Sequence, residues 1–263
     1  MRCKGLSLLL TLAMLAGAAA YAQTATIPGG PSESDSLKAM VAIFNDPNSQ
    51  PSAFDAAVDS FERQFPKSTN MIRVLVTAVR YHRLRQEFLP ELHYGMAALK
   101  LDPGDLYVMS SLGMAIPDNV NPNDLDMDEL LSQAKGYDEA VLATTGTFQI
   151  TAQGFVFSGI HYTKKQAHEL DDNLSGPAYI SLGRIAMMRQ KYADAVTAFR
   201  SALAYQPTAD TQAQTYYYIG AAEVAAQQNT AAKADLAKAR SLAPSSQLLQ
   251  KMIAIQETKL SGN

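Results

Sequence analysis

The chain has 263 residues, with 22 Lys and Arg against 25 Asp and Glu, four His, one Cys and no Trp. A formal net charge of −3 provides no general basic field for holding phosphate backbones, which argues against a general nucleic-acid-binding protein. The hydrophobic content of 47% argues against wholesale disorder, and the length is enough for one large core or two small ones.

The first 22 residues have the pattern of a Sec-type signal peptide. Arg2 and Lys4 precede an apolar run from Leu6 to Leu15, and Ala20-Tyr21-Ala22 supplies a small-x-small cleavage site. We therefore expect cleavage before Gln23 and a periplasmic or secreted protein. An uncleaved N-terminal anchor is the alternative, because the apolar stretch approaches the length of a membrane span.

The only cysteine, Cys3, lies inside this leader. The processed chain would then have no thiol, so it could form no disulfide and could not be a thiol enzyme. Gln23 stands at the predicted cleavage point where a lipid anchor would need a cysteine. Since no later segment is apolar for long enough to cross a bilayer, we expect no membrane span in the mature form.

Residues 23–33 are small, polar and broken by prolines, which is typical of a flexible lead-in. Beyond them, apolar residues recur three and four positions apart, which predicts a series of helices. The predicted helices lie near residues 34–45, 51–65, 69–86, 88–101, 105–116 and 124–144. Because the breaks between them are short, neighbouring helices should be antiparallel, and residues 34–144 should form degenerate helical repeats.

Internal repetition is clearest in the last third of the chain. The pattern Tyr179-x2-Leu182-Gly183-x2-Ala186, Ala195-x3-Phe199, Ala202, Pro207 returns 37 residues later as Tyr216-x2-Ile219-Gly220, Ala232-x3-Leu236, Ala239, Pro244. Small residues such as Gly183 and Ala195 would let two helices approach closely, and Pro207 would end the second helix.

This pattern resembles the tetratricopeptide repeat (TPR), with Tyr179 in place of the family's Trp and Ala186 in place of its Tyr. The resemblance weakens upstream, where Glu91 and Gly95 replace the family's Ala and aromatic residue. It implies an all-α fold in an exported bacterial protein, namely a right-handed superhelical array of antiparallel helix pairs (an α-solenoid). Residues 176–263 would form a TPR pair closed by a capping helix near 246–260.

Residues 145–175 fit this scheme poorly. Phe148, Phe155, Phe157 and Ile160 partly alternate, as in a strand, but a degenerate helix accounts for them equally well. We expect an irregular insertion or a decayed repeat over this range.

The spaced acids Asp124, Asp126 and Asp128 resemble the start of a calcium loop. Such a loop would need glycine at Glu129 and an acidic residue at Lys135, so the match fails. The simpler interpretation is that Asn123 or Asp124 caps the following helix and that the other acids favour its positive N-terminal end.

The four histidines are too dispersed for one metal ion and are expected on the surface or in a groove. His161 and His168 would lie about two helical turns apart, and His82 and His93 fall on either side of Pro90. The sequence contains neither a Gly-x-Ser-x-Gly elbow nor a Walker phosphate loop. We therefore expect no catalytic residue, no metal and no cofactor.

A basic cluster formed by Arg73, Arg80, Arg83 and Arg85 surrounds Tyr81. Export would remove nucleic acid as a ligand. Two interpretations remain open, a solvated helix face and a site for an acidic segment of a partner.

In the TPR family, the first helix of each pair lines the inside of the array, and its non-core face is the usual binding surface. If the resemblance holds, a period of 3.6 residues places on that face Val76, Arg80, Arg83, Leu84, Ile180, Arg184, Met187, Met188, Tyr217, Ala221, Val224 and Ala225. The candidate partner contacts are Arg80, Arg83, Leu84, Arg184, Met188, Tyr217 and Val224. Met and Tyr suit adaptable peptide contacts, although such stripes also occur in cores.

The sequence therefore predicts a non-enzymatic exported scaffold or adaptor that holds a protein or an extended peptide in its concave groove. The family's clamp for a C-terminal carboxylate is not expected, because its Asn residues are missing. Two alternatives remain: an envelope enzyme with its site in residues 145–172, and an architectural protein that self-associates through its terminal helices.

Overall fold

The computed structural model describes residues 31–121 and 123–261. The predicted signal peptide over 1–22 and the lead-in as far as residue 30 lie outside the described residues. The chain divides into two compact units, Met1–Val74 and Leu75–Asn263, and helix α3 (Met71–Arg85) crosses the boundary between them.

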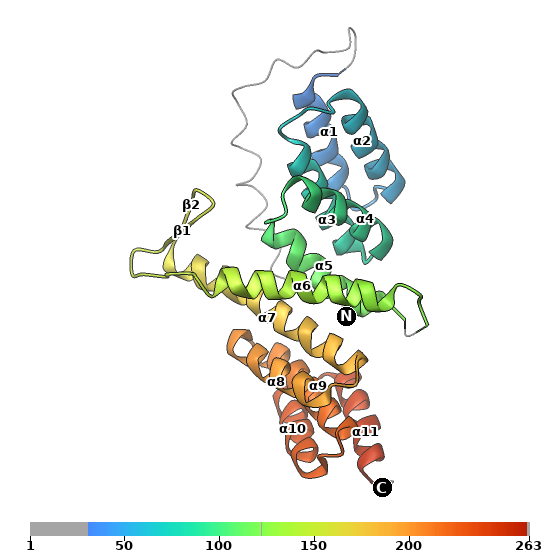
Figure 1. Cartoon of the computed structure of the whole chain (residues 1–263), viewed down its shortest axis with the longest axis vertical. Coiled ribbons are helices and arrows are strands. Elements are labelled where there is room, and N and C mark those ends of the chain that lie inside the picture. The colour runs from blue at the N-terminus through green and yellow to red at the C-terminus, as the bar shows by residue number, and fades with distance from the viewer. Residues whose placement is uncertain (1–30, 122, 262–263) are drawn as a thin grey trace. The chain divides into compact units, whose positions relative to one another are not determined.

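The first unit contains helices α1 (Glu33–Asn45) and α2 (Pro51–Gln64) (Figure 1). The Ser32 side chain accepts a hydrogen bond from the Asp35 N–H and so caps α1. Phe54 is fully buried, and its ring meets the Phe44 ring edge-on with centroids 6.4 Å apart. Aromatic packing between the two helices therefore forms the core of this unit.

The second unit is almost entirely helical, and helices that are neighbours in sequence pack against each other (Figure 1). After α3 its elements are α4 (Phe88–Leu101), α5 (Leu106–Asn119), α6 (Met127–Thr145), β1 (Phe155–Phe157), β2 (Ile160–Tyr162), α7 (Lys164–Met188), α8 (Tyr192–Ala202), the 3-10 turn η1 (Leu203–Tyr205), α9 (Ala209–Ala225), α10 (Asn229–Leu242) and α11 (Gln247–Ser261). The predicted all-α array of helix pairs is confirmed, including the terminal helix.

The repeated glycines lie where helices touch. A Cβ built on Gly183 would lie 2.5 Å from Cδ1 of Phe199, and one built on Gly220 would lie 2.7 Å from Cγ of Leu236. All four residues are buried. The pairs α7–α8 and α9–α10 therefore use the same contact, in which a glycine of the first helix receives a large side chain of the second.

Three first helices end in the same way, on a glutamine with positive φ: Gln86, Gln190 and Gln227, at 60°, 57° and 58°. In each case the N–H of the next residue donates to a carbonyl five residues earlier, at 2.8–3.0 Å. This is the geometry of a Schellman C-cap, which usually uses glycine. Because the glutamines are not glycines, sequence patterns gave no signal for this repeated helix ending.

The predicted irregular stretch contains a small antiparallel hairpin. Phe155 pairs with Tyr162, and Phe157 pairs with Ile160. Ser158 and Gly159 form the two-residue turn, with φ of 49° and 77°, the positive values that suit the twist of a tight hairpin.

The aromatic side of this hairpin is anchored on the helices. The Phe148 ring lies 4.5 Å from the Phe155 ring and 5.3 Å from the Phe157 ring, between centroids. Phe148 and Phe157 also pack against a core that includes Met109 of α5 and Val141 of α6. The alternation seen in the sequence therefore belongs to a strand pair.

Helix α7 begins earlier than predicted, so the boundary placed between residues 175 and 176 falls inside it. Thr163 and Gln166 form a capping box in which each side chain bonds the backbone of the other residue. The helix then continues through Pro177 to Met188. The predicted insertion over 145–175 thus ends at Thr163, because the cap starts a helix in a polar stretch with a weak apolar period.

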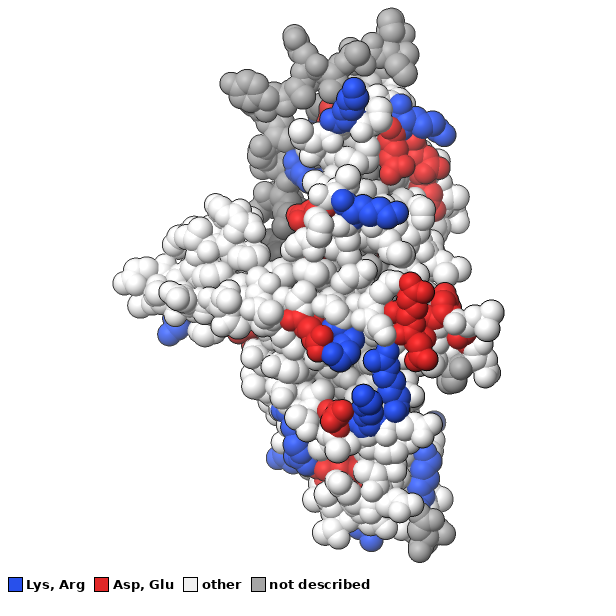
Figure 2. Space-filling view, in the orientation of Figure 1, with Lys and Arg blue, Asp and Glu red and all other residues white. Residues whose placement is uncertain are grey.

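The start of α6 also differs from the prediction. Its N-cap is Asp126, whose side chain makes no capping hydrogen bond, so the predicted capping by Asn123 or Asp124 is wrong. Asp124 instead accepts a hydrogen bond from the Asn121 N–H at 2.7 Å and closes the preceding turn. Asp128 and Glu129 do occupy the first turn, and Figure 2 shows acidic side chains gathered where α6 begins.

Candidate partner-binding face

The predicted contact residues of the second unit come from α3, α7 and α9, and they belong to a surface that α5 and α11 also form. We call it the odd-helix face. Polar contacts link its helices in order: Arg83 of α3 to Ser111 of α5, Asp118 of α5 to Arg184 of α7, Arg184 to Tyr218 of α9, and Tyr217 of α9 to Gln256 of α11. The helices therefore present one connected surface.

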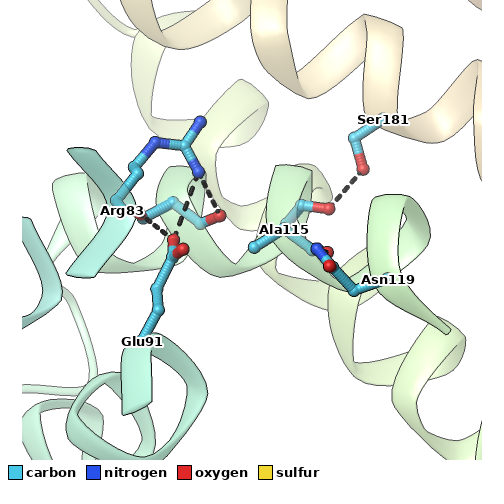
Figure 3. A network of polar contacts seen from close by, with 7 residues as sticks. Arg83, Glu91, Ala115, Asn119 and Ser181 are labelled. Carbon is cyan, nitrogen blue, oxygen red and sulfur yellow. Dashed lines mark hydrogen bonds and ion pairs between the residues drawn. The ribbon is translucent and has the colours of Figure 1, made fainter. Parts of the chain in front are cut away.

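Arg83 is held in place by groups of the protein itself (Figure 3). Its guanidinium donates to the Ser111 carbonyl at 3.0 Å and to Glu91 Oε1 at 3.2 Å. The Ser111 hydroxyl donates to the same Glu91 oxygen at 2.7 Å. Since the Glu91 side chain is only 4% exposed, Arg83 neutralises a buried carboxylate, and this role is structural.

Arg80 is the arginine of this region that remains available. It is half-buried, and no ion pair or hydrogen bond of its side chain is found within residues 31–121 and 123–261. Burial raises the pKa of the nearby Tyr107 hydroxyl, while the positive charges of Arg83 and Arg80 oppose that shift. Leu84, one turn further along α3, is 57% exposed. This end of the face therefore offers a cation, a phenol and an apolar side chain.

Arg184 connects three helices at the middle of the face. It forms an ion pair with Asp118 and donates to the Tyr218 hydroxyl at 2.6 Å. Burial by itself would lower the pKa of Arg184, but Tyr218 and Asp118 outweigh it and the pKa is raised. Arg184 is thus a bridge between α5, α7 and α9.

A hollow of about 330 Å³ with a mixed apolar and polar lining lies where α7, α9 and α11 meet. Its lining residues are Met187, Ala221, Val224, Ala225, Gln227, Asn229, Gln256, Lys259 and Leu260. Four of them, from Met187 to Ala225, are residues that the repeat register placed on the binding face. The other lining residues include three amides, Gln227, Asn229 and Gln256, and one lysine, Lys259.

A second hollow of about 370 Å³ lies at the other end of the face and is more polar. It is lined by Arg83, Gln86, Phe88, Glu91, Ala115, Asp118 and Asn119. Asn119 donates from Nδ2 to the Ala115 carbonyl, so its own amide is partly engaged. Among the predicted contacts only Arg83 lines this hollow.

The remaining predicted residues vary in position. Tyr217 is half-buried, and its hydroxyl accepts a hydrogen bond from Gln256 Nε2 at 3.4 Å. Met188 is half-buried at the end of α7 and does not line either hollow. Ile180, which the helical period placed on the face, is only 7% exposed and packs in a core cluster with Phe199 and Ile219. Its assignment to the face is wrong, because α8 and α9 enclose that side of α7.

Sequence reasoning missed the contribution of α5 to this face. Tyr107 and Asp118 both lie there, and Asp118 holds Arg184. Aligning Gly113 with Gly183 would have placed Asp118 at the position of Met188, so the signal was present in the repeat register.

The histidines and acids show no metal-binding arrangement: the described ranges contain no group of three or more His, Cys, Asp or Glu placed to hold an ion. His82, expected on the surface or in a groove, is fully buried; its Nδ1 lies 2.8 Å from Glu87 Oε2 and its ring stacks on Tyr94. His161 and His168 are exposed.

In the described part of the chain, no helix combines the length and the apolar character that a bilayer crossing requires.

Comparison with known proteins gives evidence on the fold alone. No protein-family model matches the chain, and no curated protein does. Among solved structures, it is similar to TTC0263, described as a thermophilic TPR protein in Thermus thermophilus, with a TM-score of 0.50 and 16% identity. The match covers 86% of this chain and 100% of that one. Together with the repeated helix pairs, this likeness confirms a TPR-like helical-repeat fold.

Proposed function

We propose that this protein is an exported, non-enzymatic scaffold or adaptor that binds a protein or an extended peptide on its odd-helix face. The observation that carries the proposal is the hollow between α7, α9 and α11, whose lining combines apolar side chains with amides and a lysine. Met187, Ala221 and Val224 line it, at positions that the repeat register places on the binding face. A helical-repeat fold is commonly used for protein interaction, which supports the same conclusion.

The chemistry of the face supports a partner with both acidic and apolar side chains. Arg80, which is unpaired within the described residues, offers a positive charge beside Leu84, and the hollow offers apolar surface at Val224. The hollow is at the small end of the roughly 300–1,000 Å³ range of ligand pockets, which suits side chains of a partner. The contact would be modest in area and reversible.

The arginines divide into two roles under this proposal. Arg83 and Arg184 position the helices, because each is bonded to carboxylates and other groups of the protein. Arg80 and Leu84 contact the partner. A ligand that recruited Arg83 would have to compensate the buried Glu91 carboxylate, which is unfavourable.

Site-specific crosslinking tests this assignment. A photoreactive amino acid is placed at Val224, at Arg80 and, as a control on the same unit, at the exposed Lys238 of α10. In the cells that make the protein, the two face positions should capture the same partner and Lys238 should not. Equal capture at Lys238, or none at either face position, would contradict the proposal.

Charge substitutions supply the quantitative test. Val224→Glu and Arg80→Glu should each weaken binding of the captured partner at least tenfold, whereas Lys238→Glu should leave it unchanged. Circular dichroism checks that all three variants keep their helices, and a sizing column distinguishes self-association from binding of another protein.

Export is part of the same proposal and rests on the leader at residues 1–22. Protein recovered from the envelope or medium should begin at Gln23 by mass spectrometry. Recovery of a membrane-bound chain that begins at Met1 would show an uncleaved anchor instead.

A further inference from the structure

The described residues of the second unit include three buried carboxyl groups, and one of them has no partner among those residues. Glu91 accepts hydrogen bonds from Arg83 and from the Ser111 hydroxyl, and Glu223 accepts one from Arg200 at 2.9 Å. Asp138 of α6 is 0% exposed, and neither of its carboxyl oxygens has a hydrogen-bond partner among the described residues. A buried carboxylate in that condition is strongly disfavoured relative to the neutral acid.

Asp138 occupies a position that the neighbouring repeats fill with an apolar side chain. Ala134-x3-Asp138 of α6 corresponds to Ala195-x3-Phe199 of α8 and Ala232-x3-Leu236 of α10. Each of these side chains packs against a glycine of the preceding first helix, respectively Gly113, Gly183 and Gly220. The other two helix pairs fill this position with Phe or Leu, so packing of the helices does not require a carboxyl group here.

The surroundings of Asp138 offer it no counter-charge within the described ranges. On α5 a Cβ at Gly113 would lie 2.9 Å from Asp138 Cγ, so helix backbone faces the carboxyl group there. On α7 the facing group is Ser181, whose hydroxyl donates to the Gly113 carbonyl at 2.7 Å. Burial raises the pKa of Asp138 to about 8; the nearby Ser181 hydroxyl opposes this shift and the negative charge of Glu139 adds to it.

The other charged side chains that face this junction bond to groups other than Asp138. Arg189 of α7 donates to the Ser132 hydroxyl of α6 at 2.8 Å and to the Asp128 carbonyl at 3.3 Å. On α6, Lys135 is bonded to Glu139. Asp118 of α5 and Arg184 of α7 form the ion pair of the odd-helix face. Neutralising Asp138 therefore requires a proton.

We propose that the packing of α6 against α5 and α7 is a proton-dependent joint, in which the neutral acid form of Asp138 keeps the three helices together. Opening the joint lets water reach the carboxyl group and releases its proton. Because α5 and α7 also carry the Asp118–Arg184 link, opening changes the odd-helix face where its basic and apolar parts meet. That last consequence rests on the proposed function, whereas the joint itself does not.

The sign of the pH dependence follows from linkage. The carboxyl group binds its proton more tightly in the closed joint than in the open one, so stability is fully present below its ordinary pKa of 3.8. It is lost as pH rises, and the loss is complete once pH exceeds about 8. Over the intervening range the open form gains up to about tenfold in population per pH unit.

Hydrogen exchange on the processed full-length chain tests the joint. Between pH 6 and pH 8, protection of the α6 amides, corrected for the intrinsic chemical rate, should fall by up to about a hundredfold and then level off. In Asp138→Asn the protection of α6 should be independent of pH. Glu139→Gln, which changes an exposed acid on the same helix, is the matched control and should keep the wild-type trend.

Two outcomes would overturn the proposal: wild-type protection of α6 that is independent of pH, and the same pH trend in Asp138→Asn as in the wild type. Asp138→Leu, which restores the side chain found at Leu236, serves if the amide variant does not fold. Carboxyl carbon-13 NMR of the wild-type chain is a further check that needs no variant. Titration of Asp138 near its ordinary value of 3.8 would also overturn the proposal.

Discussion

Replacing Gly183 with alanine tests the close contact between α7 and α8. A Cβ at this position would lie 2.5 Å from Cδ1 and 2.7 Å from Cζ of Phe199, whereas carbon atoms in contact prefer about 3.5–4.0 Å. Phe199 is 1% exposed, and its ring stacks on the Tyr218 ring with centroids 5.3 Å apart. The ring is therefore enclosed by the protein, with Tyr218 against one face.

Two opposing effects set the magnitude. Alanine is a better helix former than glycine by about 1 kcal/mol, which favours the variant. Forcing an extra carbon into a packed core costs about 1–3 kcal/mol and sometimes more. Because the overlap involves several atoms of one buried ring, the cost should lie at the upper end of this range, and we expect Gly183→Ala to lower the free energy of unfolding by about 1–2 kcal/mol net. Gly136→Ala in α6 should instead raise it by about 0.5–1 kcal/mol, since nothing lies within 4 Å of a Cβ there.

Urea unfolding followed by far-ultraviolet circular dichroism measures both variants. Adding Phe199→Leu to Gly183→Ala should recover part of the loss, with a coupling energy of about 1 kcal/mol or more between the two sites. The packing argument would be refuted if Gly183→Ala were as stable as the wild type while Gly136→Ala behaved as expected.

Three further predictions concern charges and a helix ending. Arg83→Met should lower the free energy of unfolding by about 2–4 kcal/mol, because the substitution leaves Glu91 buried without its cation. Adding Glu91→Gln should restore most of the lost stability. If the double variant recovered none of it, the structural role of Arg83 would be contradicted. Burial and the neighbouring Asp235 raise the pKa of Glu223 to about 7. The stability that this group contributes is therefore present below pH 4.5 and is lost as pH rises to about 7. Glu223→Gln should flatten that part of the pH–stability curve, and an unchanged slope would disprove the raised pKa of Glu223. Gln190→Gly should raise the free energy of unfolding by about 0.5–1 kcal/mol because φ is 57° there, which a lowered melting temperature would contradict.

The parts of the fold that could be predicted from the sequence depend on short-range patterns of residues. Apolar residues three and four apart marked the helices of the first 120 residues close to their observed ends, because that spacing forms one face of a helix whatever lies further away. Gly183 and Gly220, in the same register, marked two helix crossings correctly. The capping box at Thr163 and Gln166 was equally local, and attention to it would have placed the start of α7.

The candidate site was predictable only in part, for the same reason. The helical period placed Val224 and Ile180 on the same face; Val224 lines a hollow there, whereas Ile180 is buried. The helical period of 3.6 residues predicts only which residues of one helix lie on the same side of it. How many other helices cover that side depends on packing between segments distant in sequence.

The amino-acid sequence by itself determined a series of helix pairs, their repeat and the residues that point the same way along each helix, since these depend on neighbours within a few positions. Only the tertiary structure decided which charges meet among the described residues: Arg83 with Glu91, Arg184 with Asp118, and Asp138 with none. Arg184 and Asp118 are 66 residues apart, and the burial that governs Asp138 is set by α5 and α7 together. Such pairings are a property of the packed helices and leave no pattern in any one of them.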